Sequence, residues 1–530
     1  MFLFVVYYNG LFFSKQFNNK IIKNNFFEIS FIGLIITLFL AQILNILIPL
    51  NNYTIYFNII LICLLLFKNK KIELNISKND LFIFVIIFFI SIANIYSSNF
   101  SDDLNHYHYS SILNADTSNL IWGLCSLHPL YGTSSIWLIG QSYLNFDSTR
   151  LQDIHITNGL IFFIFLSIFL SELFKKSHEK KKYLPILFSL LIFVLIKYTR
   201  LKEFGIDRPL FLIFYFLIYY YFKYINQIEN DNLNWHFFIF CLVLISIIYI
   251  KVIFLFLLFI PLYNCYFKKL NFKFFDKKYY LIFFILIIYL FKNILISGCL
   301  VYPLVLSCFD LIPWHNPQVV KEFVFSNEVF NKSFPSYEGL LSNNDYIKNF
   351  NWFNTWVVRH KVEIIEFLAT IFLTFILTYL SFSKSITLNK KNFINKNIFI
   401  ILFIILFFSV SIFFLKNPNI RMNHHIFVIL LLFSIFYLIN KFELKIHKKI
   451  FTSIIIIILV FNFSKNINRI HQMGYENNPV KLISSKISNQ KIYYLDSFKY
   501  YVGWYGKGPV SNKELKENNF KKIFIFKIIY

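Results

Sequence analysis

The sequence has little charge, and few glycines, prolines and cysteines for its length. Only 15% of the 530 residues are charged, against about 25% in soluble domains, and 57% are hydrophobic. So little charge would not keep several soluble domains apart in water. With 13 glycines, 12 prolines and 6 cysteines, the composition excludes a collagen-like repeat, a coiled coil, a disordered chain and a disulfide-rich secreted module. The class that remains is a many-spanning membrane protein.

Acidic residues are scarce relative to basic ones. The chain has 27 Asp and Glu against 52 Lys and Arg, a formal net charge of +25. The lysines cluster in short runs between apolar stretches, as at 68–71, 175–182 and 268–278. Such runs are typical of cytoplasmic loops, and no continuous basic face with interleaved stacking residues appears. We therefore interpret the charge as a topology signal, with a lipid bilayer and not a nucleic acid as the partner.

Apolar stretches long enough for about 30 Å of hydrocarbon recur along the chain and predict about 13 transmembrane helices. With the N-terminus inside, every short lysine-rich loop falls on the cytoplasmic face. The region 235–266 is either one overlong helix or two short helices that meet near Lys251, and the lysine pattern favours two. The predicted spans are 27–50, 53–67, 81–97, 156–174, 184–199, 209–225, 235–250, 252–266, 279–296, 362–381, 397–415, 425–440 and 450–463.

The predicted fold class is an all-α polytopic membrane protein with outer loops and a small C-terminal α/β periplasmic cap. Residues 1–463 form the multi-pass domain, with long outer loops at 98–155 and 297–361, and residues 464–530 form the cap. In the cap we expect strands at 491–495 and 523–529 and a short helix at 512–517. The opening segment, residues 1–13, is too short to span and lacks a signal-peptide pattern, so we expect it to be interfacial.

The first outer loop opens with an acidic pair followed by histidines. Asp102, Asp103, His106, Tyr107 and His108 stand directly after a predicted span. Acids and histidines at this spacing can supply a general base or bind a divalent cation, although their adjacency does not establish a metal. The alternative is that the polar residues cap a following helix and solvate its end. Their position at the hydrocarbon edge, where desolvation perturbs carboxylates, favours the functional interpretation.

Arginine is rare, and in the predicted topology every arginine lies on the outer face. The guanidinium group has a fixed fork of donors that suits phosphate and carboxylate, so we expect Arg200, Arg208 and Arg421, with Asp207, to anchor a phosphate or pyrophosphate. The alternative is headgroup contact or a local pair such as Arg208 with Asp207. The complete set is Arg150, Arg200, Arg208, Arg359, Arg421 and Arg469.

Other candidates are charged or aromatic residues near the ends of spans. Lys251 and Lys292 lie in or beside apolar spans, where an ionisable group is costly unless it faces protein or a water-filled cavity; for Lys251, snorkelling from a helix end is the alternative. Tyr302 and Trp314 lie in a turn-rich outer segment and suit either stacking on a sugar or an aromatic belt. Cys299 and Cys308 share that loop and can pair in an oxidising periplasm. No P-loop, dinucleotide-binding, Gly-x-Ser-x-Gly or His-Glu-x-x-His motif occurs.

These residues carry a resemblance to a known superfamily. The layout resembles the GT-C superfamily of integral-membrane glycosyltransferases, in particular a little-characterised bacterial branch associated with cell-surface polysaccharides. The similarity covers most of the chain in layout, but its motifs are short. The matching residues are Asp103, Tyr107 and His108, then Gly123-Leu124, Leu127-His128 and Gly132-Thr-Ser-Ser135, then Tyr302-Pro303, Pro313-Trp314 and Asn417-Pro-Asn-Ile-Arg421.

The resemblance implies a glycosyltransferase of the bacterial cytoplasmic membrane whose active site faces the periplasm or exterior. It would move a sugar from a polyprenyl-phosphate-linked donor to a hydroxyl of a glycan, lipid or protein acceptor, with inversion. Asp102 or Asp103 would be the base, and outer-face cations would hold the leaving phosphate. An O-antigen-type polymerase or a lipid-linked-glycan flippase remains the alternative. The expected substrate-binding set is His106, Tyr107, His108, His128, Arg200, Asp207, Arg208, Lys251, Lys292, Tyr302, Trp314, Arg359 and Arg421.

Overall fold

The computed structural model describes most of the chain, and the described part is largely α-helical. The ranges described are 1–17, 26–68, 77–97, 103, 107–145, 151–175, 183–199, 205–225, 233–267, 277–333, 341–385, 396–441, 443–473, 483–487, 490–495, 498–502, 510–511, 520–523 and 526–529.

Each predicted span coincides with a helix, because uninterrupted runs of Ile, Leu and Phe leave the backbone no polar partner other than itself. The first half of the chain forms α1 (Phe2–Phe17), α2 (Phe26–Leu47), α3 (Asn52–Lys68), α4 (Lys78–Tyr96), α5 (Tyr109–Thr117), α6 (Ile136–Tyr143), α7 (Leu151–Leu173), α8 (Leu184–Lys197), α9 (Asp207–Tyr220), α10 (Leu233–Ile250) and α11 (Phe259–Phe267). The second half forms α12 (Lys277–Ser297), α13 (Pro317–Ser333), α14 (Asn343–Ile347), α15 (Phe353–Ser381), α16 (Lys396–Leu415), α17 (His424–Lys441) and α18 (Lys448–Met473).

In the described part of the chain, eight helices are long and apolar enough to cross a membrane: α2, α4, α7, α10, α12, α15, α16 and α18. The apolar helices α3, α8 and α17 are shorter, as is the stretch that ends in α11. A multi-pass membrane protein is the class that this composition and these lengths support. The count of about 13 spans and their orientation stay predictions.

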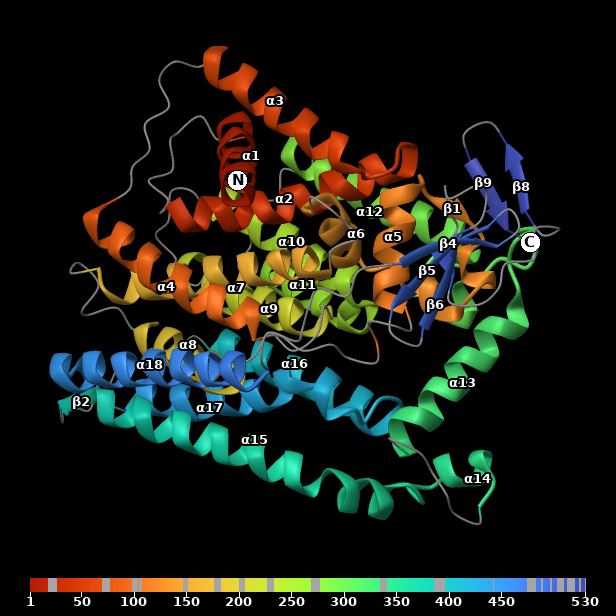
Figure 1. The fold of residues 1–530 in the computed structure, drawn as a ribbon. Coiled ribbons are helices and arrows are strands. Elements are labelled where there is room, and N and C mark those ends of the chain that lie inside the picture. The colour runs from red at the N-terminus through yellow and green to blue at the C-terminus, as the bar shows by residue number, and fades with distance from the viewer. Residues whose placement is uncertain are drawn as a thin grey trace.

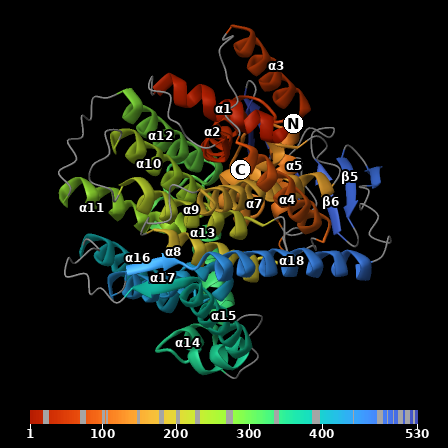
Figure 2. The same ribbon diagram turned by 90° about the vertical axis from the view of Figure 1, so that its left-hand side faces the viewer.

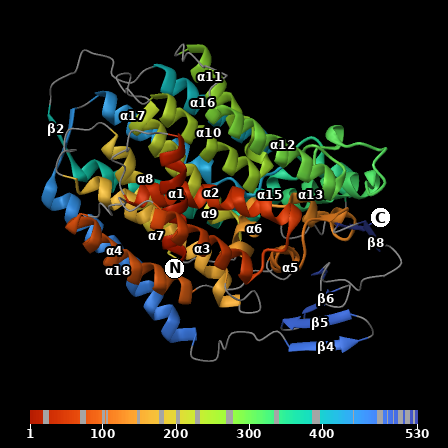
Figure 3. The same ribbon diagram turned by 90° about the horizontal axis from the view of Figure 1, so that it is seen from above.

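The helices form two layers. Helices α15 to α18 lie together on one side of the helices α1 to α12 (Figures 1 and 2). The helices α5, α6 and α13 and the C-terminal strands gather at one end of the bundle, which we call the loop end (Figures 1 and 3). We call the opposite end, which carries β2 and β3, the lysine end, after the lysine-rich loops predicted for that side (Figures 1 and 3). Described parts of all three long segments that were predicted to lie outside are therefore found at the loop end.

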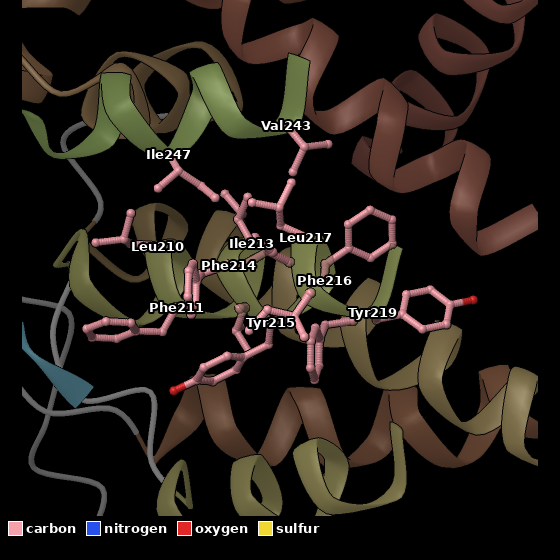
Figure 4. Packing of buried hydrophobic residues seen from close by; sticks show 14 of the residues in the cluster. Leu210, Phe211, Ile213, Phe214, Tyr215, Phe216, Leu217, Tyr219, Val243 and Ile247 are labelled. Carbon is pink, nitrogen blue, oxygen red and sulfur yellow. The ribbon is translucent and has the colours of Figure 1, made fainter. Parts of the chain in front are cut away.

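Helix α9 is the innermost helix. Almost every side chain from Asp207 to Tyr220 is buried, in all directions around the helix (Figure 4). Figure 4 shows Phe211, Phe214 and Leu217 of this helix packed among its neighbours, with Val243 and Ile247 of α10 above them. Packing of this kind, more than a hydrophobic driving force, holds helices together in a bilayer. Residues at the two ends of α9 are consequently fixed by the whole bundle.

Helix α1 crosses α2 at a steep angle and does not run alongside it (Figures 1 and 3). At the crossing, a Cβ atom on Gly10 would lie 2.2 Å from the carbonyl oxygen of Ile29, and one on Gly33 would lie 1.6 Å from that of Val6. Only glycine permits so close an approach of two backbones. The segment 1–13 is thus part of a helix packed on the bundle, and its interfacial depth stays a prediction.

The predicted break near Lys251 is confirmed. Helix α10 ends at Ile250, Lys251 has an extended backbone (φ −145°, ψ 119°), and a 3₁₀ segment, η6 (Val252–Leu258), leads into α11. The chain therefore uses two short helical pieces here instead of one overlong helix.

The strands form three small sheets. The predicted strand 491–495 is confirmed within β5, whereas the single strand expected at 523–529 is wrong, because Phe520–Ile523 and Phe526–Ile529 are two antiparallel partners, β8 and β9. The expected helix at 512–517 lies outside the described residues. Strand β9 also pairs in parallel with β1, so the C-terminal tail meets the first long loop. The strands are β1 (Ile121–Trp122), β2 (Phe382–Ser385), β3 (Glu443–Ile446), β4 (Ile483–Ile487), β5 (Gln490–Leu495), β6 (Phe498–Val502), β7 (Val510–Ser511), β8 (Phe520–Ile523) and β9 (Phe526–Ile529), in the orders β1-β9-β8, β2-β3 and β4-β5-β6-β7.

Candidate functional site

The candidate site is built around the first turn of α9. Asp207 is the first residue of the helix, and Pro209 follows in the same turn, where a missing N–H costs no helical hydrogen bond. A carboxylate at a helix N-terminus interacts favourably with the helix dipole. The sequence Asp-Arg-Pro therefore starts the central helix and places Asp207 and Arg208 at the loop end of the bundle.

Arg421 joins two carboxylates that are far apart in the sequence. Its Nη2 donates to Oδ2 of Asp103 at 2.5 Å, and its Nε lies 3.0 Å from Oδ2 of Asp207. Lys251 pairs with Asp207 through the other oxygen, Oδ1. We call Asp103, Asp207, Lys251 and Arg421 the Arg421 cluster. Two carboxylates and two cations from four separate segments of the chain thus meet at one point.

Local structure explains why the two cations reach this point. Lys251 lies at the break between α10 and η6, where the chain turns away from the helix axis. Arg421 lies in a single 3₁₀ turn, η8 (Ile420–Met422), capped by Asn419, whose Oδ1 accepts from the backbone N–H of Arg421 at 3.0 Å. Asn423 closes the same turn by donating to the carbonyl of Asn419 at 2.8 Å. Asparagine side chains that bond to nearby backbone are the usual means of fixing such turns.

His108 is a buried titratable group next to the Arg421 cluster. It is 1% exposed, and burial lowers its pKa to about 4, although Asp103 and Asp207 act in the opposite direction. Within the part of the chain that the structure describes, neither ring nitrogen has a hydrogen-bond partner. Buried polar atoms are nearly always paired with protein, water or ligand. The hydrogen-bonding capacity of this neutral imidazole is therefore unused among the described residues.

A cavity of about 430 Å³ adjoins the Arg421 cluster between α8, α9, α15, α17 and α18. Among the described residues, its lining carries five cations and three carboxylates, a surplus of two positive charges. Lys197 pairs with Glu366 at 2.8 Å across the cavity wall. The charged lining residues are Lys197, Arg208, Arg421, Lys465 and Arg469, with Asp207, Glu363 and Glu366.

One wall of this cavity is aromatic. The ring of His424 lies 5.1 Å from that of Phe211 and 4.4 Å from that of Phe367, measured between centroids. Arg469 is fixed on another wall, where its Nη1 donates to the carbonyl of Thr199 at 2.6 Å. A cavity with surplus positive charge, fixed donors and flat rings can hold a phosphate beside a sugar or another amphipathic ring.

The structure brings together six of the residues predicted from the sequence to form the site. They are Asp103, His108, Asp207, Arg208, Lys251 and Arg421. Tyr107 is half-buried beside His108, with the ring centroids 4.2 Å apart. Asp102, His106 and Arg200 lie outside the described residues.

The remaining predicted residues have other surroundings. Lys292 donates to the carbonyl of Ser134 at 3.0 Å, and Tyr302 donates to that of Pro129 at 2.8 Å. Trp314 donates from Nε1 to the carbonyl of Ile294 at 3.0 Å, a contact within the fold.

His128 and Arg359 also stand apart from the cluster. The Nδ1 of His128 accepts from the backbone N–H of Leu130 at 3.3 Å and so caps a 3₁₀ turn, whereas Arg359 is exposed on α15. The sequence did not separate these two residues from the cluster because both lie in the predicted outer loops.

Sequence reasoning missed several cavity residues. In the sequence, Lys197 and Lys465 resemble the many other lysines, and Glu366 lies within a predicted span. His424 follows Arg421 closely, but only the arginine of this segment stands out by its rarity. A usable signal existed, since Lys197 and Lys465 stand at the predicted outer ends of their spans, away from the lysine-rich loops.

The expectation of a divalent cation stays a prediction. Within the described residues, one group of His, Cys, Asp or Glu side chains lies close enough together to hold a metal: Cys299, Cys308 and His315. The two cysteines of that group form a disulfide, so their sulfurs are not thiolate ligands. The pairing of Cys299 with Cys308 that the sequence allowed is therefore present in the structure.

A second charged cluster lies beyond the other end of α9. The helix continues into a π-helical segment, η5 (Tyr221–Ile225), in which Lys223 lies 2.6 Å from Oε1 of Glu28 and 3.0 Å from Oε2 of Glu172. We call Glu28, Glu172 and Lys223 the Lys223 cluster. The sequence analysis did not identify it, because its members come from three different helical segments of the chain.

Comparison with known proteins identifies the family but no characterised relative. No curated protein and no solved structure matches the chain. A family model described as a domain of unknown function, DUF8201, matches residues 1–428, a region that contains the whole Arg421 cluster. Because this match covers most of the sequence, the chain belongs to the DUF8201 family.

Proposed function

We propose that this protein is a membrane glycosyltransferase that moves a sugar from a polyprenyl-phosphate-linked donor to an acceptor hydroxyl. The observation that carries the proposal is the contact of Arg421 with both Asp103 and Asp207 at the edge of a cavity with surplus positive charge. Sugar transfer from a lipid phosphate needs a carboxylate near the anomeric carbon and cations near the leaving phosphate. Both are found here within one arginine side chain of each other.

The proposed reaction assigns a role to each side of Arg421. The carboxylate of Asp103 accepts the proton of the acceptor hydroxyl as its oxygen forms the new bond to the anomeric carbon. The bond from that carbon to the phosphate oxygen breaks, and the phosphate leaves with the electron pair. Arg208 and Arg421 stabilise the charge that develops on the leaving group, as fixed donors do in other transfer reactions.

Arg421 would also couple donor binding to the release of the Asp103 carboxylate as a base. Without a ligand, its guanidinium is occupied by Asp103 at 2.5 Å. A phosphate in the cavity competes for the same donors, because guanidinium binds phosphate and carboxylate with the same fork. As the phosphate binds, the Asp103 carboxylate is released towards the acceptor. Binding of the donor would thus free the base at the same time.

An apolar cavity offers room for the lipid chain of the donor. It has a volume of about 580 Å³ and lies between α1, α4 and α7, lined by side chains such as Phe84, Ile95 and Phe163. Ile95 belongs to the last turn of α4, and the segment that follows this helix carries Asp103. A hydrocarbon chain in this cavity would therefore end close to the loop that bears the proposed base.

The proposal is tested in cells that lack the protein and are complemented with the wild type or with Asp103→Asn. Mass spectrometry of total glycans and lipid-linked intermediates is the measurement. We expect the variant to be present at the wild-type level, to leave one sugar missing from a surface glycan, and to accumulate the lipid-linked donor. Asp345→Asn, at an exposed position on α14, is the matched control and should restore the glycan.

Two outcomes would count against sugar transfer. A normal glycan in the Asp103→Asn cells would remove the catalytic role of that carboxylate. Lipid-linked donor that is confined to the cytoplasmic leaflet in the cells that lack the protein would indicate a flippase. A flippase moves the lipid-linked sugar across the membrane without breaking the bond between sugar and phosphate.

A further inference from the structure

The loop that follows α12 exposes large apolar side chains to an unusual degree. Leu306 is 95% exposed and Leu311 is 97% exposed, and Leu304 between the turns is 51% exposed. Leucines scattered singly on a surface need no explanation, but three within one short loop form a patch. Such a patch is costly in water, so it indicates a surface that is covered in the working protein.

The loop is held in shape by its own bonds. The disulfide between Cys299 and Cys308 closes its base, and the backbone N–H of Leu300 donates to the carbonyl of Ser307 at 2.9 Å. The N–H of Phe309 donates to the carbonyl of Gly298 at 2.9 Å. The leucines are therefore presented by an ordered scaffold, and their exposure is a property of the fold.

The position of the loop relative to α12 identifies what covers it. The exposed face of α12 is a stripe of apolar residues at helical spacing, Tyr280, Phe283, Phe284, Ile287 and Phe291. Such a stripe on a helix long and apolar enough to span is typical of contact with lipid. Its next position is Ile294, whose carbonyl accepts the N–H of Trp314 at 3.0 Å. The loop thus begins where the stripe ends, and it carries a half-buried tryptophan, a residue type that is enriched at membrane–water interfaces.

We propose that Leu306 and Leu311 insert into the headgroup and upper acyl region of the bilayer and anchor the loop end of the molecule to the lipid surface. Asp310, which is 83% exposed between them, would remain among the headgroups. A protein partner fits less well, because the loop directly follows α12, whose exposed apolar stripe is typical of contact with lipid. This inference concerns the membrane contact alone and does not depend on sugar transfer.

The test places a photocrosslinking residue, p-benzoylphenylalanine, at Leu306 or Leu311 of the full chain in native membranes. Both side chains are almost fully exposed, so neither replacement should disturb folding. After irradiation, intact-mass spectrometry of the purified protein identifies the adduct. We expect a mass increase equal to a phospholipid at both positions. The same residue at Asp345, on the exposed helix α14, is the control and should give little lipid adduct.

An adduct to another protein at Leu306 and Leu311 would overturn the proposal, as would the absence of any adduct when the control position behaves as expected. A lipid adduct at Asp345 equal to that at Leu306 would also overturn it, because the contact would then not be specific to the loop.

Discussion

The central helix α9 and its π-helical extension carry a charged cluster at each end, and the two clusters differ in how completely their groups are paired. At the lysine end, every carboxylate oxygen of Glu28 and Glu172 accepts a hydrogen bond. Lys223 donates to both acids, and Tyr183 donates to Glu172 at 2.5 Å. At the loop end, the Arg421 cluster opens into a cavity with surplus positive charge, and both nitrogens of His108 lack a partner among the described residues.

This difference shows that a buried charge alone does not identify a functional site. An ionisable group inside a membrane protein is a functional candidate by default, yet the Lys223 cluster is closed by its own tyrosines and acids. A saturated network fixes helices relative to one another, whereas a cavity with surplus positive charge leaves binding capacity for an anionic ligand. We therefore propose a structural role for the lysine end and a chemical role for the loop end.

The largest effect is expected from Arg421→Lys, which keeps the charge but removes the fork that joins Asp103 to Asp207. A lysine offers one ammonium point charge and cannot contact both carboxylates and a phosphate in the same way. Loss of a fixed donor to the developing charge costs about 100-fold in rate in other enzymes. We expect a comparable fall in glycan product in complemented cells, at an unchanged protein level. A product level equal to wild type would show that the bridge is dispensable.

The opposite pattern is expected from Lys223→Met at the lysine end. Breaking a buried ion pair leaves uncompensated carboxylates and costs about 3–5 kcal/mol in soluble proteins. The variant should show a lower melting temperature and a lower yield, while the protein that remains folded keeps its affinity for lipid phosphate. Lys175→Met is the matched control, because Lys175 also pairs with Glu172 but is 36% exposed, and its loss should change stability by less than about 1 kcal/mol. A stable Lys223→Met protein without activity would reverse the assignment of the two ends.

His108 makes the stability of the loop end depend on pH. Burial lowers the pKa of this histidine to about 4, below the value of about 6.5 for an exposed histidine, so the unfolded chain binds the proton more tightly. Its contribution to the free energy of unfolding is complete above pH 6.5 and declines as the pH falls towards 4. At pH 5 the loss is on the order of 2 kcal/mol. The drop in melting temperature between pH 7 and pH 5 should therefore be smaller in His108→Gln than in the wild type. His471→Gln, at an exposed position, should leave that drop unchanged.

The smallest effect is expected from Lys465→Gln. This lysine lines the cavity but is exposed, so water and salt screen its charge. We expect the dissociation constant for undecaprenyl phosphate to rise about two- to threefold at low salt and to match the wild type at high salt. Lys348→Gln, which removes an exposed lysine outside the cavity, should have no such effect. A salt-independent loss of affinity would mean that Lys465 contacts the phosphate directly.

The long apolar helices were predictable from the sequence, and so was part of the site, whereas α5, α6, α13 and α14 lie in segments predicted as outer loops. Apolar runs bounded by lysines mark each span, and Asp103 and Arg421 stand out because acids and arginines are rare. The contact between them was not predictable, since it depends on how the segment after α4 and the turn before α17 meet at the start of α9. The same reason applies to Lys197 and Glu366, because their pairing joins α8 to α15, two helices that are far apart in the sequence.

The measurement that tests the central claim most directly is the affinity of the purified full chain, in lipid nanodiscs, for undecaprenyl phosphate. Native mass spectrometry would compare the wild type with Arg421→Lys at the loop end and Tyr183→Phe at the lysine end, with undecaprenol as the phosphate-free control. We predict that the wild type and Tyr183→Phe bind the phosphate equally and prefer it to undecaprenol, whereas Arg421→Lys binds at least about tenfold more weakly. Equal binding by all three proteins, or a loss confined to Tyr183→Phe, would contradict the account.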